Sequence, residues 1–158
     1  MVLLCPTDFA FIGKSELLSN PVTGLFFRTI DIPLNRKSKI SAFKAFKQAD
    51  ACIRSGRSVV IFPEGHIGDE FPPHLYDFKN GPFKLAIDTK VPVVPVVIHN
   101  AWKLFWDDAK QRGSRPGTVL VDVLRPIETT DVGPEHADEL RDEVYNLIKK
   151  QWNNSGGL

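Results

Sequence analysis

The sequence contains few cysteines and no long apolar run. Cys5 and Cys52 are the only cysteines, and their spacing fits no metal-binding motif. We expect both to be free, reduced thiols of a cytosolic setting, where disulfides are rare. No stretch reaches about 18 consecutive apolar residues, the length that indicates a membrane-spanning helix. We therefore expect no metal centre, no disulfide scaffold and no spanning segment in this chain.

An excess of charge of one sign is also absent. The 158 residues include 20 Lys and Arg against 19 Asp and Glu, which gives a formal net charge of +1. No global field then attracts nucleic acid or anionic lipid, so any anion must be bound by a local group of residues. We expect no nucleic-acid partner. The length and the hydrophobic content of 42% predict a single globular domain, residues 1–158.

The clearest strand pattern is at residues 59–62, where Val-Val-Ile-Phe predicts a strand buried on both faces. Pro63 ends the ladder because it has no N–H to donate. Glu64 and Gly65 follow at the carboxyl end, where ligands bind in open α/β sheets. A binding site and a plain strand end with a solvated Glu explain these residues equally well.

The remaining periodicity alternates between extended and helical segments. Strands are predicted at 9–12, 29–34, 58–62, 91–98 and 118–125, helices at 22–29, 37–54, 81–89 and 134–152, and a short helix or turn at 14–18. This order predicts an α/β domain with a mostly parallel, twisted sheet flanked by helices. A doubly wound nucleotide-binding domain is disfavoured, because no glycine-rich loop follows a strand.

Two of the predicted helices are long and amphipathic. Ser38 is the expected N-cap of the helix at 37–54, and Gly56 is its expected stop. The predicted buried face of this helix is Ile40, Phe43, Phe46, Ala49 and Ile53. That of the helix at 134–152 is Ala137, Leu140, Val144, Leu147 and Ile148.

Four stretches resemble, in order and spacing, the sequence blocks of the glycerolipid acyltransferases, the family of the lysophosphatidate (1-acylglycerol-3-phosphate) acyltransferases. Ile-Pro-Leu-Asn-Arg at 32–36 resembles the second block, which ends in Asp-Arg in the family. Phe-Pro-Glu-Gly at 62–65 resembles the third block, and residues 78–86 resemble the segment that follows it. Residues 91–96 resemble the fourth block, although a core strand explains them better than acyl-donor binding.

The first block of the family, His-x-x-x-x-Asp, is not in this chain. In the family this His is the general base that takes the proton from the acceptor hydroxyl, and the Asp orients it. The chain has four histidines, His66, His74, His99 and His136. The residues five positions after them are Phe71, Lys79, Leu104 and Arg141, and none of these is Asp. We expect a truncated chain that lacks the N-terminal part of the family domain and has no catalytic residue. A naturally shortened, inactive relative is the competing explanation, and a substitute role for His66 or His99 is disfavoured.

The resemblance implies a set of substrate-binding residues. Arg36 corresponds to the arginine that binds the acceptor phosphate, and a guanidinium fork matches that geometry. Lys14 would be a second phosphate contact, and Lys79, with Lys84, would add positive potential. The alternative explanation for each of these basic residues is a solvated surface cation without a binding role.

The other two implied contacts are in the third block. Glu64 would accept hydrogen bonds from the glycerol hydroxyl or hold a neighbouring cation, and Gly65 would let the backbone approach closely. Asn35 replaces the Asp of the second block, so Arg36 loses a charged partner. We expect Arg36 and Glu64 to face the same small cavity.

The resemblance further implies a function in phospholipid biosynthesis. The acyl group would move from acyl-CoA or acyl-carrier protein to a lysophosphatidate-type hydroxyl, with no bound cofactor. The protein would be peripheral on the cytoplasmic face of a membrane, but as this fragment we expect it to be inactive. The alternative is a non-catalytic lipid- or phosphate-binding module on the same scaffold. Residues 25–27, together with Trp102, Phe105 and Trp106, would meet the membrane or, preferably, pack in the core.

Overall fold

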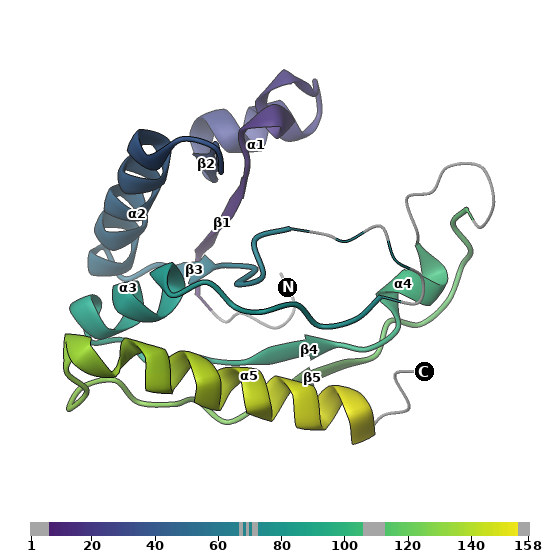
Figure 1. Cartoon of the computed structure of the whole chain (residues 1–158). Helices are drawn as coiled ribbons and strands as arrows, with labels where there is room; N and C mark the ends of the chain where they lie inside the picture. Colours follow the sequence, from purple (N-terminus) through teal and green to yellow (C-terminus); the bar gives the residue numbers. More distant parts are fainter. Residues whose placement is uncertain (1–6, 67, 69, 71–72, 106–112, 155–158) are drawn as a thin grey trace. The chain divides into compact units, whose positions relative to one another are not determined.

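The computed structural model describes residues 7–66, 68, 70, 73–105 and 113–154 (Figure 1). The chain divides into two compact units, Met1–Gly65 and His66–Leu158, each described by itself. Cys5, predicted to be a free thiol, and Trp106, predicted to pack in the core or meet the membrane, lie outside the described residues. No described helix is both long and apolar enough to cross a membrane.

The first unit contains a parallel three-stranded sheet with helical crossovers. Its elements are β1 (Phe9–Lys14), η1 (Ser15–Ser19), α1 (Thr23–Thr29), β2 (Ile32–Leu34), α2 (Lys39–Arg54) and β3 (Ser58–Val60). The strand order is β2-β1-β3, and both pairings are parallel. The predicted α/β class is thus confirmed, with helices connecting the parallel strands (Figure 1).

The central strand of this sheet is β1, which pairs with both neighbours. Ala10 and Ile12 are accordingly buried, with 0% and 6% of their surface exposed. The prediction that residues 59–62 form a strand buried on both faces is wrong, because β3 is an edge strand among the described residues and ends at Val60. Phe62 is 58% exposed.

The ends of α2 agree with the sequence, and of its predicted buried face only Ala49 is buried. Ser38 is the N-cap, since its Oγ accepts a hydrogen bond of 3.2 Å from the Ser41 N–H, and Gly56 follows the helix with φ +86°. Ile40 and Phe43 are each 71% exposed, so the prediction that they are buried is wrong. Small side chains instead let α2 pack closely on the strands, and its buried residues are Ala45, Ala49 and the free thiol Cys52.

The helix α1 packs through one side only. Gly24 and Phe27 are buried, and the Phe27 ring lies so close to Gly13 of β1 that a Cβ at position 13 would collide with it. Leu25 and Phe26 are 63% and 48% exposed. The preference for core packing of residues 25–27 therefore holds for Phe27 and is wrong for the two residues before it.

The second unit pairs helices with a short antiparallel ribbon. Its elements are α3 (Gly81–Thr89), β4 (Val96–Ile98), α4 (Ala101–Leu104), β5 (Val121–Val123), η2 (Pro134–His136) and α5 (Ala137–Asn154). β4 and β5 are antiparallel, with Val96 opposite Val123. The strand predicted at 91–98 is shortened to β4 and one bridge at Val93, because Pro92 and Pro95 donate no N–H.

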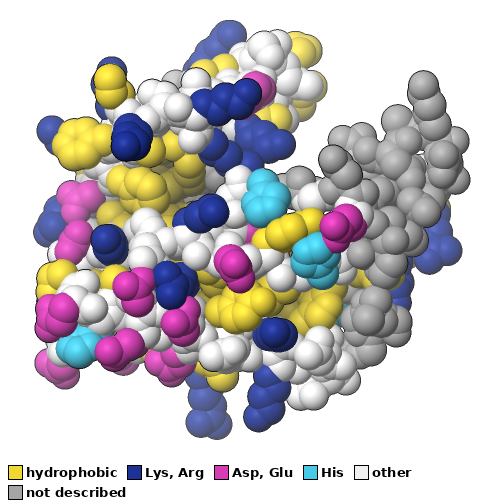
Figure 2. Space-filling model, viewed as in Figure 1, with side chains coloured by type: hydrophobic (Ala, Val, Ile, Leu, Met, Phe, Trp, Pro, Cys, Tyr) yellow, Lys and Arg dark blue, Asp and Glu magenta, His cyan; other side chains and the backbone are white. Residues whose placement is uncertain are grey.

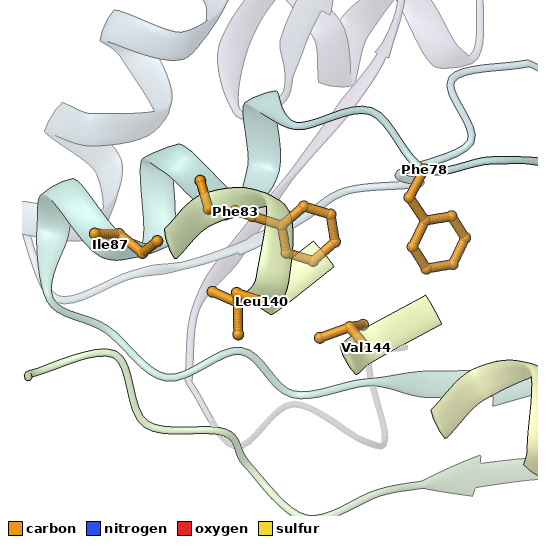
Figure 3. Close-up of a cluster of buried hydrophobic side chains, with 6 residues drawn as sticks. Phe78, Phe83, Ile87, Leu140 and Val144 are labelled. Carbon is orange, nitrogen blue, oxygen red and sulfur yellow. The ribbon is translucent and has the colours of Figure 1, made fainter. Parts of the chain in front are cut away.

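The core of the second unit lies between α3 and α5. Phe83 and Ile87 of α3 lie opposite Leu140 and Val144 of α5, and Phe78 extends this cluster (Figure 3). The predicted buried face of the C-terminal helix is confirmed at Ala137, Leu140 and Val144, whereas Leu147 is 38% exposed.

A polar cluster ties β4, β5 and α5 together. His99 is 6% exposed, and its Nε2 lies 2.8 Å from Asp122 Oδ2. Gln151 Nε2 donates a hydrogen bond of 2.7 Å to the same oxygen, and the Trp152 ring stacks on His99. The hydrogen bonds of Gln151 and His99 to the Asp122 carboxylate hold its pKa below the ordinary value of 3.8, because they stabilise the charged form.

Matched isoleucine-to-alanine substitutions test the difference in burial between Ile87 of α3 and Ile40 of α2. Ile87→Ala removes a side chain that is 1% exposed, and we expect the free energy of unfolding to fall by about 2–4 kcal/mol. Ile40→Ala changes an exposed position, and we expect a change below about 0.5 kcal/mol. Urea unfolding measures both values. Equal losses would show that the outer face of α2 is buried after all.

A second prediction concerns the acid stability of the polar cluster. Because the folded pKa of Asp122 is depressed, its contribution is fully present above the unfolded value and disappears as the pH falls through the folded value. We expect Asp122→Asn to lower the melting temperature at neutral pH, and the difference from wild type to shrink below about pH 4. Melting temperatures across pH measure this effect, with exposed Asp131→Asn as the control. A difference that does not depend on pH would contradict the assignment.

Candidate functional site

Three of the predicted site segments lie at one edge of the first unit's sheet. Because β1, β2 and β3 are parallel, their carboxyl ends share this edge. Lys14 is the last residue of β1, Arg36 follows the end of β2 by two residues, and Glu64 follows the end of β3 by four. We call this edge, with the residues that follow its strands, the carboxyl edge. Ligands of open α/β sheets bind at this position.

The register brings the two predicted phosphate contacts to neighbouring strands. Lys14 lies directly opposite Leu34, two residues before Arg36. Adjacent strands are about 4.8 Å apart, so the backbones at these two strand ends are close neighbours. Lys14 and Arg36 are both exposed. Glu64 follows β3, the strand on the other side of β1, which lies roughly two strand spacings or 10 Å away from β2.

A hydrogen-bonded turn holds the backbone at Arg36. The Ser38 N–H donates to the Asn35 carbonyl at 3.1 Å, and the Lys37 N–H donates to Asn35 Oδ1 at 3.0 Å. The Asn35 N–H in turn donates to Ser41 Oγ at 2.9 Å. Asn and Asp both build such a turn through their side-chain oxygen. Asn35 therefore keeps the turn that the family's Asp could form, and only the negative charge is lost.

A second turn follows β3. The Gly65 N–H donates to the Phe62 carbonyl at 3.2 Å, and Gly65 has a φ of +74°. Pro63 is well suited to the second position of such a turn, and only glycine adopts a positive φ without strain. Glu64 is half-buried between these residues. A side chain at position 65 would strain the turn that presents Glu64.

The fifth predicted residue is Lys79. It belongs to the second unit, where it is exposed just ahead of α3, and Lys84 is exposed on α3 itself. The first unit alone supplies Lys14, Arg36, Glu64 and Gly65. The shared cavity of Arg36 and Glu64, and the roles of all five predicted residues, stay predictions.

The sequence reasoning missed one cation at the carboxyl edge. Lys37 is exposed and occupies the same turn as Arg36. The Lys37 backbone N–H donates the hydrogen bond to Asn35 Oδ1, so the turn positions Lys37 as well as Arg36. The signal in the sequence was a pair of basic residues directly after a strand.

The buried His99 offers no accessible substitute for the absent first block, whereas His66 and His74 are exposed and their roles stay untested. His99 forms a His–Asp pair with Asp122, but its Nε2 is engaged and its Nδ1 is buried without a hydrogen-bond partner. Neither nitrogen can reach a substrate hydroxyl, so His99 is structural. His136 Nδ1 lies 3.0 Å from Glu139 Oε2 on the exposed start of the last helix. In the described part of the chain, no three His, Cys, Asp or Glu residues gather as metal ligands.

Comparison with known proteins places this arrangement in a family. The model of the Acyltransferase family matches residues 1–99. The 1-acyl-sn-glycerol-3-phosphate acyltransferase alpha of Mus musculus is 30% identical over 153 residues, which are 94% of this chain and 52% of that protein. The chloroplastic 1-acyl-sn-glycerol-3-phosphate acyltransferase BAT2 of Brassica napus is also 30% identical, over 92% of this chain and 40% of its own.

A solved structure shares the fold. The crystal structure of the 1-acyl-sn-glycerophosphate acyltransferase PlsC from Thermotoga maritima matches with a TM-score of 0.70 and 26% identity. The match covers 92% of this chain and 56% of that one. The chain spans about half the length of the curated relatives named above. The resemblance in the sequence blocks is thus confirmed: the chain belongs to the Acyltransferase family, among the glycerolipid acyltransferases.

Proposed function

We propose that this chain carries the acceptor-binding part of a lysophosphatidate-type acyltransferase. The observation that carries the proposal is the register of β1 and β2, which aligns Lys14 with the strand end that precedes Arg36. The relatives support it, since those from mouse and Brassica napus are named 1-acyl-sn-glycerol-3-phosphate acyltransferases. The acceptor would be a glycerolipid with a phosphate monoester.

The exposed cations suit the head group of such an acceptor. A guanidinium donates two parallel hydrogen bonds to a phosphate, whereas an ammonium acts as a point charge. In this proposal Arg36 binds the phosphate, Lys14 and Lys37 add positive potential, and Glu64 accepts a hydrogen bond from a glycerol hydroxyl.

The proposed chemistry needs an acyl thioester as donor. The acceptor oxygen forms a bond to the thioester carbonyl carbon, the carbon–sulfur bond breaks, and the thiol leaves with the proton of the hydroxyl. The donor would be acyl-CoA or acyl-carrier protein, and because a thioester is already activated, no bound cofactor is required. Since the acceptor is a lipid, we further propose a peripheral location on the cytoplasmic face of a membrane.

The chain contains no His-x-x-x-x-Asp motif, and we expect negligible turnover from residues 1–158 alone. The physical reason is that the sequence lacks the family's His-Asp block, and the buried pair of His99 with Asp122 cannot replace it, since neither nitrogen of His99 is free to take the hydroxyl proton. Release of free thiol from acyl-CoA in the presence of lysophosphatidate measures turnover. Rates typical of a complete enzyme would contradict this prediction.

A second candidate function is a non-catalytic lipid- or phosphate-binding module. The missing first block favours it, because the binding residues do not depend on that block. The genomic sequence upstream of the Met1 codon distinguishes the two functions. An in-frame His-x-x-x-x-Asp block there favours the enzyme, and a stop codon without such a block favours the binding module.

Head-group binding tests the acceptor site directly. We expect Arg36→Ala to weaken binding of glycerol 3-phosphate by about tenfold or more, the effect of losing charge-assisted hydrogen bonds. Arg36→Lys should restore part of the affinity, because it keeps the charge and loses the fork. NMR titration of the 158-residue chain measures the dissociation constants.

The matched control for this titration is Arg125→Ala, which removes an exposed arginine of the second unit. It should leave the affinity unchanged. Inorganic phosphate serves as the second ligand and separates a head-group site from a general anion site. Equal effects of the two alanine substitutions would contradict the assignment of Arg36.

A further inference from the structure

We propose that the outer faces of α1 and α2 form a surface that docks on an anionic phospholipid bilayer. The surface consists of Val22, Leu25, Phe26 and Ile30 around α1, and of Ile40, Phe43, Lys44 and Lys47 on α2; we call it the docking surface. The inference rests on the proposed function only in taking a lipid assembly as the partner.

Four large apolar side chains of the docking surface share one side of α1. Val22, Leu25, Phe26 and Ile30 are 70%, 63%, 48% and 47% exposed. Their spacing of three, four and eight residues confines them to about 140° of arc at 100° per residue. The buried residues of α1 lie on the opposite side, where Phe27 packs against Gly13 of β1 and Gly24 lies against the Leu18 carbonyl of η1. The exposed apolar face is therefore the side of the helix that the sheet does not cover.

The first turns of α2 repeat this arrangement. Ile40 and Phe43 are each 71% exposed, and helical spacing puts Lys44 and Lys47 on the same stripe. The buried Ala45 lies on the opposite side, with Ala49 and Cys52. Apolar side chains flanked by lysines are typical of a helix at a membrane interface, where the lysine stems extend to the head groups.

The charge around these helices is predominantly positive. From the start of η1 to the end of α2, residues 15–54 contain seven basic residues and three acidic ones, although the whole chain has a net charge of only +1. Of the acidic residues, Asp31 accepts a hydrogen bond from the Phe11 N–H through its Oδ1, and Asp50 forms an ion pair of 3.0 Å with Arg54. Over α1 and α2, Figure 2 shows mainly hydrophobic and basic side chains. This charge complements an anionic lipid surface, which singles out a bilayer as the partner.

The topology connects the docking surface to the carboxyl edge. The crossover through η1 and α1 leaves the carboxyl end of β1, and α2 begins five residues after the carboxyl end of β2. Ile40, in the first turn of α2, therefore lies only four residues along the chain from Arg36. A bilayer held by the first turns of α2 would bring lipid head groups to the edge where Lys14 and Arg36 lie.

Vesicle co-sedimentation of the 158-residue chain tests this proposal. The probes are vesicles of phosphatidylcholine alone and of phosphatidylcholine mixed with phosphatidylglycerol. We expect binding to the anionic vesicles that weakens with added salt, because screening reduces the attraction. Leu25→Ser/Phe26→Ser and Lys44→Glu/Lys47→Glu should each weaken this binding by about tenfold or more.

Matched controls keep the test specific. Val119→Ser/Leu120→Ser removes comparably exposed apolar side chains, and Lys149→Glu/Lys150→Glu makes the same change of charge on α5. Both control proteins should bind vesicles as the wild type does, and circular dichroism with thermal melting checks that every variant folds. Because the vesicles contain no phosphate monoester acceptor, vesicle binding can fail while glycerol 3-phosphate binding persists, and the reverse.

Two outcomes would overturn the proposal. One is equal loss of vesicle binding in the controls and in the docking-surface variants. The other is absence of binding to the anionic vesicles by the wild type. If the chain then self-associates in sedimentation velocity and Leu25→Ser/Phe26→Ser abolishes this, the surface is a contact between copies of this chain.

Discussion

The parallel pairing of β1 with both β2 and β3 is the constraint on which the first unit depends. Parallel neighbours cannot be joined by a tight hairpin, so each connection must cross over, and here α1 and α2 make the crossovers. The same pairing aligns three carboxyl ends at one edge. Lys14, Arg36 and Glu64, which are far apart in the chain, share that edge because the ladder of backbone hydrogen bonds permits one register.

The two turns at this edge have different physical origins. At Arg36 the turn is held by side chains, because Asn35 accepts from the Lys37 N–H and Ser41 accepts from the Asn35 N–H. At Glu64 the turn is held by the backbone, and the positive φ of Gly65 makes glycine necessary. Short polar residues and glycine thus hold the turns that present the charged side chains.

Burial in the two crossover helices follows side-chain size rather than hydrophobicity alone. Ala45, Ala49 and Cys52 let α2 approach the sheet, and the much larger Ile40 and Phe43 face away. The sequence pattern favoured the larger residues, because spacing identifies an apolar stripe but not which of two stripes meets the sheet. The helix α5 has a single apolar stripe, and its other residues are mostly polar, so the sequence alone identifies the buried side. The predicted burial of Ala137, Leu140 and Val144 is confirmed.

Local signals in the sequence determined the element types, the capping residues of α2, the effect of the prolines near β4 and the resemblance to the family, because each acts within a few neighbouring residues. The tertiary structure alone decided that β1 rather than β3 is central, which face of α2 is covered, and that His99 is sealed by Asp122 and Trp152. These outcomes depend on contacts between residues distant in sequence, and hydrophobic periodicity contains no information about which partner a strand or a helix face meets.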